Sequence, residues 1–221
     1  MSNDFVPLEW NELPEDEMKL RATALYEQMN LRRTTRHFSE RTVPRELIEK
    51  AIMCASTAPS GAHLQPWTFV AVSNAEMKLK MREAAEVEEE KTYSERMPEA
   101  WQEVLQPLGT DAVKEHMTTA PWLVILFRQS KRIRSNGEFG PTYNSTESCG
   151  IAAGMFIQAI HNMGLATLTH TPSPMGFLRE ILGRPAHEHA MLVMPVGYPA
   201  EDAAVPNISR KPLEDVAIFV E

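Results

Sequence analysis

The stretch VPRELIEKAIMCASTAPSGAHLQPWTFVAV occupies residues 43–72 and passes from a helical pattern to a strand pattern through a loop of small residues. Proline suits the first turn of a helix, so Pro44 predicts a helix that begins there and continues to about residue 56. The following TAPSG sequence should end the helix and form a loop. Residues 67–72 have the composition of a strand.

The same kinds of pattern continue on both sides of this stretch. We predict further helices over residues 15–30, 74–96, 110–118 and 145–164, further strands over 121–127, 166–169 and 190–197, and a loop over 130–143. The helix at 145–164 is apolar nearly all round, which indicates burial on several sides and hints at a subunit interface. The terminal VAIFV resembles a strand without a nearby partner, so we expect it to join a sheet elsewhere, on this subunit or another. Helices around a central sheet give an α+β or α/β fold.

The composition excludes several classes of function. The chain has 221 residues and a net charge of -8, which suits one domain and argues against binding to nucleic acid or to an anionic membrane. The sequence contains neither an apolar run of about 20 residues nor a signal-peptide pattern, so we expect a cytoplasmic protein. Cys54 and Cys149 lack the spacing of a metal or redox pair, and we expect both to be reduced core thiols. No metal site is predicted.

A basic cluster stands out in this acidic chain. Arg32, Arg33, Thr34 and Arg36 lie within five residues, together with one further hydroxyl. Guanidinium groups form strong bonds to phosphate, so the cluster could bind a phosphate monoester. It equally fits a solvated turn paired with nearby acids. Because no glycine-rich nucleotide motif is present, any nucleotide would have to be held by side chains.

Three further segments carry candidate site residues. The loop before Trp67 is made of small residues that allow a flat ligand to approach the backbone, although it also fits a plain turn. The THT sequence at 169–171 could bring a hydroxyl to a ligand or simply cap a strand. Arg210 belongs to a second basic spot near the end of the chain.

A possible amino acid site comes from the long polar helix and the segment after it. Glu89 and Tyr93 are four residues apart and therefore share a helix face, and Lys114 follows in the next predicted helix. Glu89 could accept an ammonium group, Lys114 could bind a carboxylate, and Tyr93 could bond to either and cover a ring. A glutamate in an EEE run also fits a solvated helix surface.

The order of these motifs resembles the nitroreductase superfamily, and within it the iodotyrosine deiodinases. The resemblance covers residues 28–221 and rests on RRTTRHF, the PSG loop before PWTF, PVGYP and RKPLED, with the EEE, tyrosine and lysine spacing as its more specific part. It implies a nitroreductase-like α+β fold with a central mixed sheet flanked by helices, in a domain-swapped homodimer. One domain over 1–221 would comprise an N-terminal extension at 1–27, an active-site lid at 75–118 and a C-terminal extension at 200–221 that reaches the partner subunit.

The resemblance also implies an FMN cofactor and roles for single residues. Thr171 would place its hydroxyl near flavin N5, the amide of Ala62 would face the substrate phenolate, and these two residues would be catalytic. Ala62, Glu89, Tyr93 and Lys114 would bind a halotyrosine. The residues expected to bind FMN are Arg32, Arg33, Thr34, Arg36, Pro59, Ser60, Gly61, Thr169, His170, Thr171 and Arg210.

The implied reaction is reductive dehalogenation of halotyrosines to tyrosine and halide, by stepwise electron transfer from reduced flavin. The electron donor would be an NAD(P)H-linked reductase or a flavodoxin- or ferredoxin-type protein. The vertebrate enzymes of this kind carry a membrane anchor, whereas this chain resembles a soluble bacterial homologue. The main alternative is a general NAD(P)H-dependent FMN nitroreductase or quinone reductase, which would not need Glu89, Tyr93 and Lys114. A binding protein without turnover is a further alternative.

Overall fold

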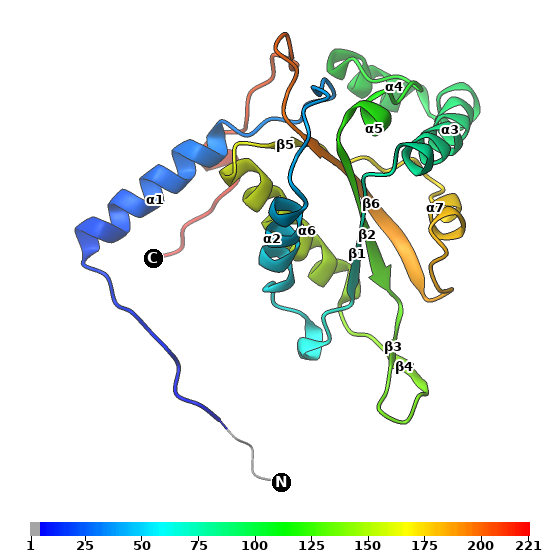
Figure 1. The fold of residues 1–221 in the computed structure, drawn as a ribbon. Coiled ribbons are helices and arrows are strands. Elements are labelled where there is room, and N and C mark those ends of the chain that lie inside the picture. The colour runs from blue at the N-terminus through cyan, green and yellow to red at the C-terminus, as the bar shows by residue number, and fades with distance from the viewer. Residues whose placement is uncertain (1–4) are drawn as a thin grey trace. The chain divides into compact units, whose positions relative to one another are not determined.

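The computed structural model describes residues 5–221, which form two compact units divided between Arg32 and Arg33 (Figure 1). The first unit contains α1 (Glu15–Asn30), as predicted. None of the residues of α1 is buried, and its apolar side chains Leu20, Leu25 and Tyr26 are between 47% and 68% exposed. These three side chains point to different sides of the helix, so α1 has no single apolar face.

The second unit is built around a four-stranded sheet in the order β1-β2-β6-β5. The strands are β1 (Trp67–Val72), β2 (Trp122–Gln129), β5 (Ala166–Thr167) and β6 (Glu188–Gly197). All three ladders are antiparallel, and the parallel contact expected of a mixed sheet is confined to an isolated bridge between Thr34 and Thr167.

Helices cover both faces of the sheet (Figure 1). One face packs against α2 (Arg45–Ser56) and α6 (Ser145–Asn162), and the other against α3 (Ala75–Lys91), α5 (His116–Thr119) and α7 (Gly176–Ile181). The alternation of β2 explains the two cores, since successive side chains of a strand point to opposite faces. Leu126 belongs to the core under α2 and α6, whereas Ile125 and Phe127 belong to the other core.

Several elements differ from the sequence predictions. The long helix continues beyond α3 as a π-helical turn at Thr92–Arg96, and α4 (Glu99–Leu105), a 3-10 turn at Gln106–Leu108 and α7 were not predicted. The predicted helix over 110–118 is wrong for most of its length, because only α5 is helical. Gly109 adopts a left-handed conformation and the Asp111 carboxylate accepts a hydrogen bond from the Val113 amide, so a turn replaces the first helical residues.

The predicted loop over 130–143 contains a hairpin, β3 (Lys131–Ile133) and β4 (Phe139–Pro141). The predicted C-terminal strand is wrong for this chain taken alone. Only a 3-10 turn, Leu213–Asp215, forms there, and the following Ile218 and Val220 are 92% and 93% exposed. The expectation of two core thiols holds for Cys149, whereas Cys54 is exposed.

Candidate functional site

A buried ion pair lies where α3 approaches the loop before α5. The carboxylate Oε2 of Glu89, in the last turn of α3, lies 3.1 Å from the Nζ atom of Lys114. The two side chains are only 12% and 4% exposed. Burial, the largest influence, would raise the pKa of Glu89, but the hydrogen bond to His170 and the charge of Lys114 outweigh it and lower this pKa. Glu89 is therefore ionised at neutral pH although it is largely buried. Its neighbour Glu90 in the EEE run is exposed.

Tyr93 completes a three-residue cluster. Its position in the π-helical turn after α3 brings its ring within 5.6 Å of the Lys114 ammonium group, and its hydroxyl donates a hydrogen bond of 3.2 Å to the Thr110 hydroxyl. Burial raises the pKa of Tyr93, so the phenol is neutral at physiological pH. The structure thus brings together all three residues predicted to bind an amino acid, with one negative group, one positive group and one aromatic face.

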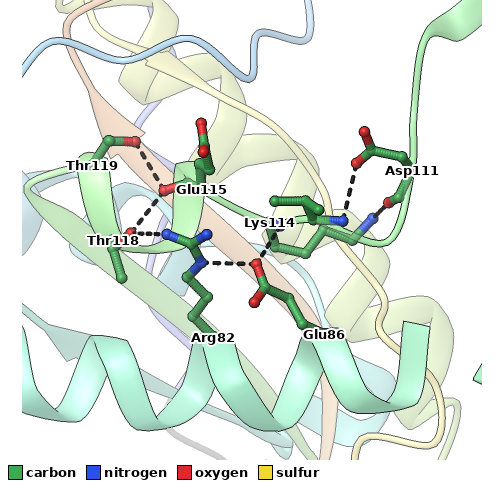
Figure 2. A network of polar contacts seen from close by, with 8 residues as sticks. Arg82, Glu86, Asp111, Lys114, Glu115, Thr118 and Thr119 are labelled. Carbon is green, nitrogen blue, oxygen red and sulfur yellow. Dashed lines mark hydrogen bonds and ion pairs between the residues drawn. The ribbon is translucent and has the colours of Figure 1, made fainter. Parts of the chain in front are cut away.

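A second layer of contacts fixes the backbone of Lys114 (Figure 2). Glu86, one turn before Glu89 on α3, accepts a 2.7 Å hydrogen bond from the Lys114 amide. Arg82 holds the same carboxylate at 2.8 Å and also donates to the Thr118 hydroxyl at 2.9 Å. The Lys114 ammonium group additionally donates to the Asp111 carbonyl. These bonds attach the loop that carries Lys114 to the helix that carries Glu89.

Two histidines that sequence analysis had not assigned to the amino acid site border the cluster. His170 Nε2 lies 3.2 Å from Glu89 Oε1, and the His116 and His170 rings meet edge to face with centroids 5.3 Å apart. Burial, with a smaller contribution from His170 and nearby cations, lowers the pKa of His116 to about 3, so this ring is neutral. The positions of the two histidines in the sequence give no indication of this contact.

The basic cluster is divided between the two compact units. Arg32 ends the first unit, whereas Arg33, Thr34 and Arg36 belong to the second. Thr34 and Arg36 line a pocket of about 300 Å³ that also involves residues 107–109 and 204–206. The Arg33 guanidinium donates to the Pro206 carbonyl at the same place. A guanidinium and a hydroxyl in one pocket have the donor chemistry that a phosphate monoester requires.

The THT segment follows β5 and lies beside the ion pair. His170 is buried and forms a bridge to Val193 of β6, whereas Thr169 and Thr171 are exposed. This alternation directs both threonine hydroxyls away from the core, where a ligand could meet them. Arg210 is also exposed and lies in the irregular segment before the 3-10 turn at Leu213–Asp215.

The loop with Pro59, Ser60, Gly61 and Ala62 lies at the opposite end of the second unit from α3, α4 and α5 (Figure 1). Its backbone is unusual, because Ala62 has a φ of 53° and His63 a φ of 54°. A non-glycine residue rarely adopts a positive φ, and such conformations concentrate at functional sites. Because the loop lies at the opposite end of the second unit, one subunit alone does not bring it to Glu89, Tyr93 and Lys114.

The space at Gly61 and the contacts of Ser60 explain how this loop is held. A side chain at Gly61 would begin 2.5 Å from the Tyr143 carbonyl, so no larger residue fits. The Gly61 amide donates to the Ser148 hydroxyl of α6 at 3.2 Å, and the Ser60 hydroxyl accepts from the Gln65 amide at 3.0 Å. The loop is thus anchored to α6, while Ala62 is exposed.

Within residues 5–221, no group of three or more potential metal-ligating side chains is close enough to bind a metal ion. Over the same residues, no helix combines the length and the apolar character that crossing a membrane requires.

Comparison with known proteins identifies the class. The model of the nitroreductase family matches residues 30–198, and the chain belongs to this family. Among curated relatives, the iodotyrosine deiodinase of Haliscomenobacter hydrossis is 49% identical over 94% of this chain and 93% of its own length, and iodotyrosine deiodinase 1 of Homo sapiens is 43% identical over 98% and 75%. These identities place the chain among the iodotyrosine deiodinases of the family.

Solved structures agree with this assignment. The crystal structure of oxidized iodotyrosine deiodinase bound to FMN and 3-iodo-L-tyrosine matches with a TM-score of 0.76 and 26% identity, covering 89% of this chain and 97% of that chain. A nitroreductase with bound FMN from Bacteroides fragilis matches with a TM-score of 0.68 at 20% identity, over 89% and 98% of the two chains, and so supports the fold. The nitroreductase-like α+β fold expected from the sequence is confirmed.

Proposed function

We propose that the protein is an FMN-dependent reductive dehalogenase of halotyrosines, with 3-iodotyrosine and 3,5-diiodotyrosine as substrates and bromo- and chlorotyrosine as further candidates. The observation that carries this proposal is the buried pair of Glu89 and Lys114 beside Tyr93. A general nitroreductase has no use for such a pair, because nitroaromatics carry no zwitterion. Relatives named iodotyrosine deiodinase, 42–49% identical over most of the chain, support the same function.

The ion pair suits an amino acid because its two charges match those of the zwitterion. The substrate ammonium group would bind to Glu89 and the substrate carboxylate to Lys114, so each buried charge exchanges one partner for another. Such an exchange avoids leaving an unpaired buried charge, which is the costly state. Tyr93 then covers the substrate, and the segment from α3 to α5 encloses it and excludes water.

The residues of the chain also fit FMN. Arg33, Thr34 and Arg36, with Arg32, would hold the phosphate and ribityl chain, and Arg210 would reach the phosphate or the pyrimidine edge. The exposed hydroxyls at 169–171 and the loop at 59–61 would contact the ring system. When bound, FMN supplies the two electrons that, together with one proton, replace the carbon–halogen bond by a carbon–hydrogen bond and release halide.

Two groups of the chain would act at the reacting atoms. The backbone amide of Ala62, held in a left-handed conformation, would donate to the substrate phenolate and favour the keto form whose halogen-bearing carbon is tetrahedral. The Thr171 hydroxyl would donate to flavin N5 and favour one-electron steps. The role of Ala62 depends on the loop at 59–62 reaching the Glu89 end of a second subunit.

We therefore propose a homodimer with two composite sites. The separation of the loop at 59–62 from Glu89 within one subunit supports it. An exposed apolar segment at residues 216–220 supports it as well, since Ile218 and Val220 are 92% and 93% exposed. A face of α6 carries Gly150 and Gly154, both exposed and with no described atom within 4 Å of an added side chain, so a second helix can approach closely there. Substitution of Gly154 by leucine should convert the dimer to monomers in sedimentation, and an unchanged dimer would contradict this interface.

The proposed activity is tested by steady-state assays on the FMN-loaded protein. With a chemical reductant, 3-iodotyrosine should yield iodide and tyrosine in equal amounts, while a nitroaromatic with NADPH should be reduced more slowly. Absence of iodide release together with fast nitroaromatic reduction would replace this proposal by the general nitroreductase alternative.

A further inference from the structure

The hydrogen bond between His170 and Glu89 joins two parts of the site that the proposed function uses separately. His170 belongs to the segment assigned to the cofactor, whereas Glu89 lies at the end of α3 and is assigned to the substrate ammonium group. His170 Nε2 and Glu89 Oε1 lie 3.2 Å apart, and the side chains are 9% and 12% exposed. The contact therefore links the cofactor segment directly to the substrate-binding carboxylate.

The two oxygens of Glu89 are held from different directions. Lys114 lies 3.1 Å from Oε2, and His170 lies 3.2 Å from Oε1. Once a zwitterion binds, its carboxylate competes for Lys114, and the bond from His170 is then the contact that keeps Glu89 in place. A carboxylate fixed by a neighbouring donor loses less entropy when it binds a ligand.

The surroundings of His170 indicate which form of the ring makes this bond. Nδ1 is buried without a hydrogen-bond partner in the described chain, so an imidazolium would leave an unsatisfied N–H donor there. The titratable and charged groups that face the ring are Glu89 from α3, Lys114 from the loop before α5, His116 from α5 itself, and Arg36 from the segment before α2.

We propose that neutral His170 is a positioning residue that holds the Glu89 carboxylate for the substrate ammonium group, and that protonation of this ring at acid pH weakens substrate binding. The imidazolium would add a positive charge to those of Lys114 and Arg36 and so oppose the ammonium group. Burial, the largest influence, lowers the pKa of His170 despite the carboxylate of Glu89, so the neutral form is the working form at physiological pH. This inference rests on the proposed function, since it concerns binding of the same zwitterion.

The test measures binding of 3-iodotyrosine to the oxidised, FMN-loaded protein by calorimetry, where no turnover occurs. A second ligand, 3-(4-hydroxy-3-iodophenyl)propanoate, keeps the phenol, the iodine and the carboxylate but lacks the ammonium group. The His170→Leu variant should bind 3-iodotyrosine about tenfold more weakly, which is the scale of one lost charge-assisted hydrogen bond, and should bind the second ligand almost normally. An equal loss for both ligands, or no loss, would overturn the proposal.

The His170→Gln variant provides the conservative control, because its amide can donate to Glu89 and does not titrate. At pH 8 this variant should bind 3-iodotyrosine as tightly as the wild type. At pH 5 its affinity should fall less than that of the wild type, because it lacks the ring whose protonation opposes the substrate ammonium group. Ionisation of the substrate phenol affects both proteins alike. The same acid weakening in both proteins would overturn the role of protonation even if His170→Leu fails to fold. A wild type that binds neither ligand would instead refute the proposed function itself.

Discussion

The carboxylate of Glu89 and the ammonium group of Lys114 lie 3.1 Å apart in a nearly closed environment, although the two residues are 25 positions apart in the chain. A buried ion pair contributes little net stability, because desolvation offsets most of the attraction. A polar pair retained at such a position is therefore better explained by binding than by folding. Removal of either partner would leave the other charge buried and unpaired, so it should lower the stability of the fold as well as the affinity for the ligand.

Substitution of Lys114 by alanine should weaken binding of 3-iodotyrosine by about tenfold or more, because the substrate carboxylate loses its charged partner. FMN should remain bound, since Lys114 lies outside the cofactor cluster. The matched control is Lys91→Ala. Lys91 lies in the same region and pairs with Glu88, but its side chain is 44% exposed. Equal affinity in wild type and Lys114→Ala, measured by calorimetry, would refute the substrate assignment.

Substitution of Glu86 by glutamine should weaken substrate binding through the backbone of Lys114. The neutral amide loses its ion pair with Arg82 and accepts a weaker bond from the Lys114 amide (Figure 2). We expect a loss of about tenfold in affinity for 3-iodotyrosine with FMN content unchanged. Glu76→Gln, which breaks an exposed pair with Lys80 on the same helix, should leave affinity unaltered. A similar loss in both variants would show that the effect is not specific to Lys114.

The neutral, buried His116 should make stability depend on pH. Its pKa is about 3 in the folded protein, against 6.5 for an unperturbed histidine, so between these pH values the unfolded chain binds the extra proton. The contribution of this group to stability is thus complete above the unfolded pKa and falls as pH decreases, by about 1.4 kcal/mol per pH unit. Denaturant titrations at several pH values should show a shallower acid loss for His116→Phe than for the wild type. Parallel curves would contradict the neutral state.

Substitution of Thr171 by alanine should change the type of chemistry more than the binding. The side chain is exposed, so the fold should tolerate the change. We propose that the Thr171 hydroxyl donates to flavin N5 and favours one-electron steps. Its loss should then lower halotyrosine turnover, while reduction of a nitroaromatic by hydride transfer is maintained or increased. The ratio of the two activities measures the effect. A uniform decrease of both activities would argue against a role at N5.

Regular elements with a clear period were predictable from the sequence. The helices at 15–30 and 145–164 and the strand at 67–72 follow from the local pattern of apolar residues and from the residues that begin and end each element. The β3–β4 hairpin had a usable signal, since Asn136–Gly137 is a favoured hairpin turn and Gly137 has a φ of 81°. The predicted helix at 110–118 was wrong because side-chain bonds of Asp111 and Lys114 stabilise a turn that competes with it.

The sequence named Glu89, Tyr93 and Lys114 as candidates for one site, and the structure brings them together, but the contacts of this cluster with other residues could not be predicted. Glu89 and Tyr93 share a helix face, which spacing reveals, whereas the approach of His170 to Glu89 depends on tertiary packing across 81 residues. Likewise, the separation of the loop at 59–62 from α3 is a property of the sheet, since the loop precedes β1 at one end and α3 follows β1 at the other. The C-terminal strand pattern describes a segment that one chain leaves uncovered.

The most direct test of the central claim is an anaerobic single-turnover experiment. The bound flavin is reduced, 3-iodotyrosine is added, and flavin reoxidation is followed together with the release of tyrosine. We predict rapid reoxidation with one tyrosine and one iodide formed per flavin. A flavin that stays reduced with 3-iodotyrosine but is reoxidised by a nitroaromatic would contradict the assignment of Glu89, Tyr93 and Lys114 to a halotyrosine.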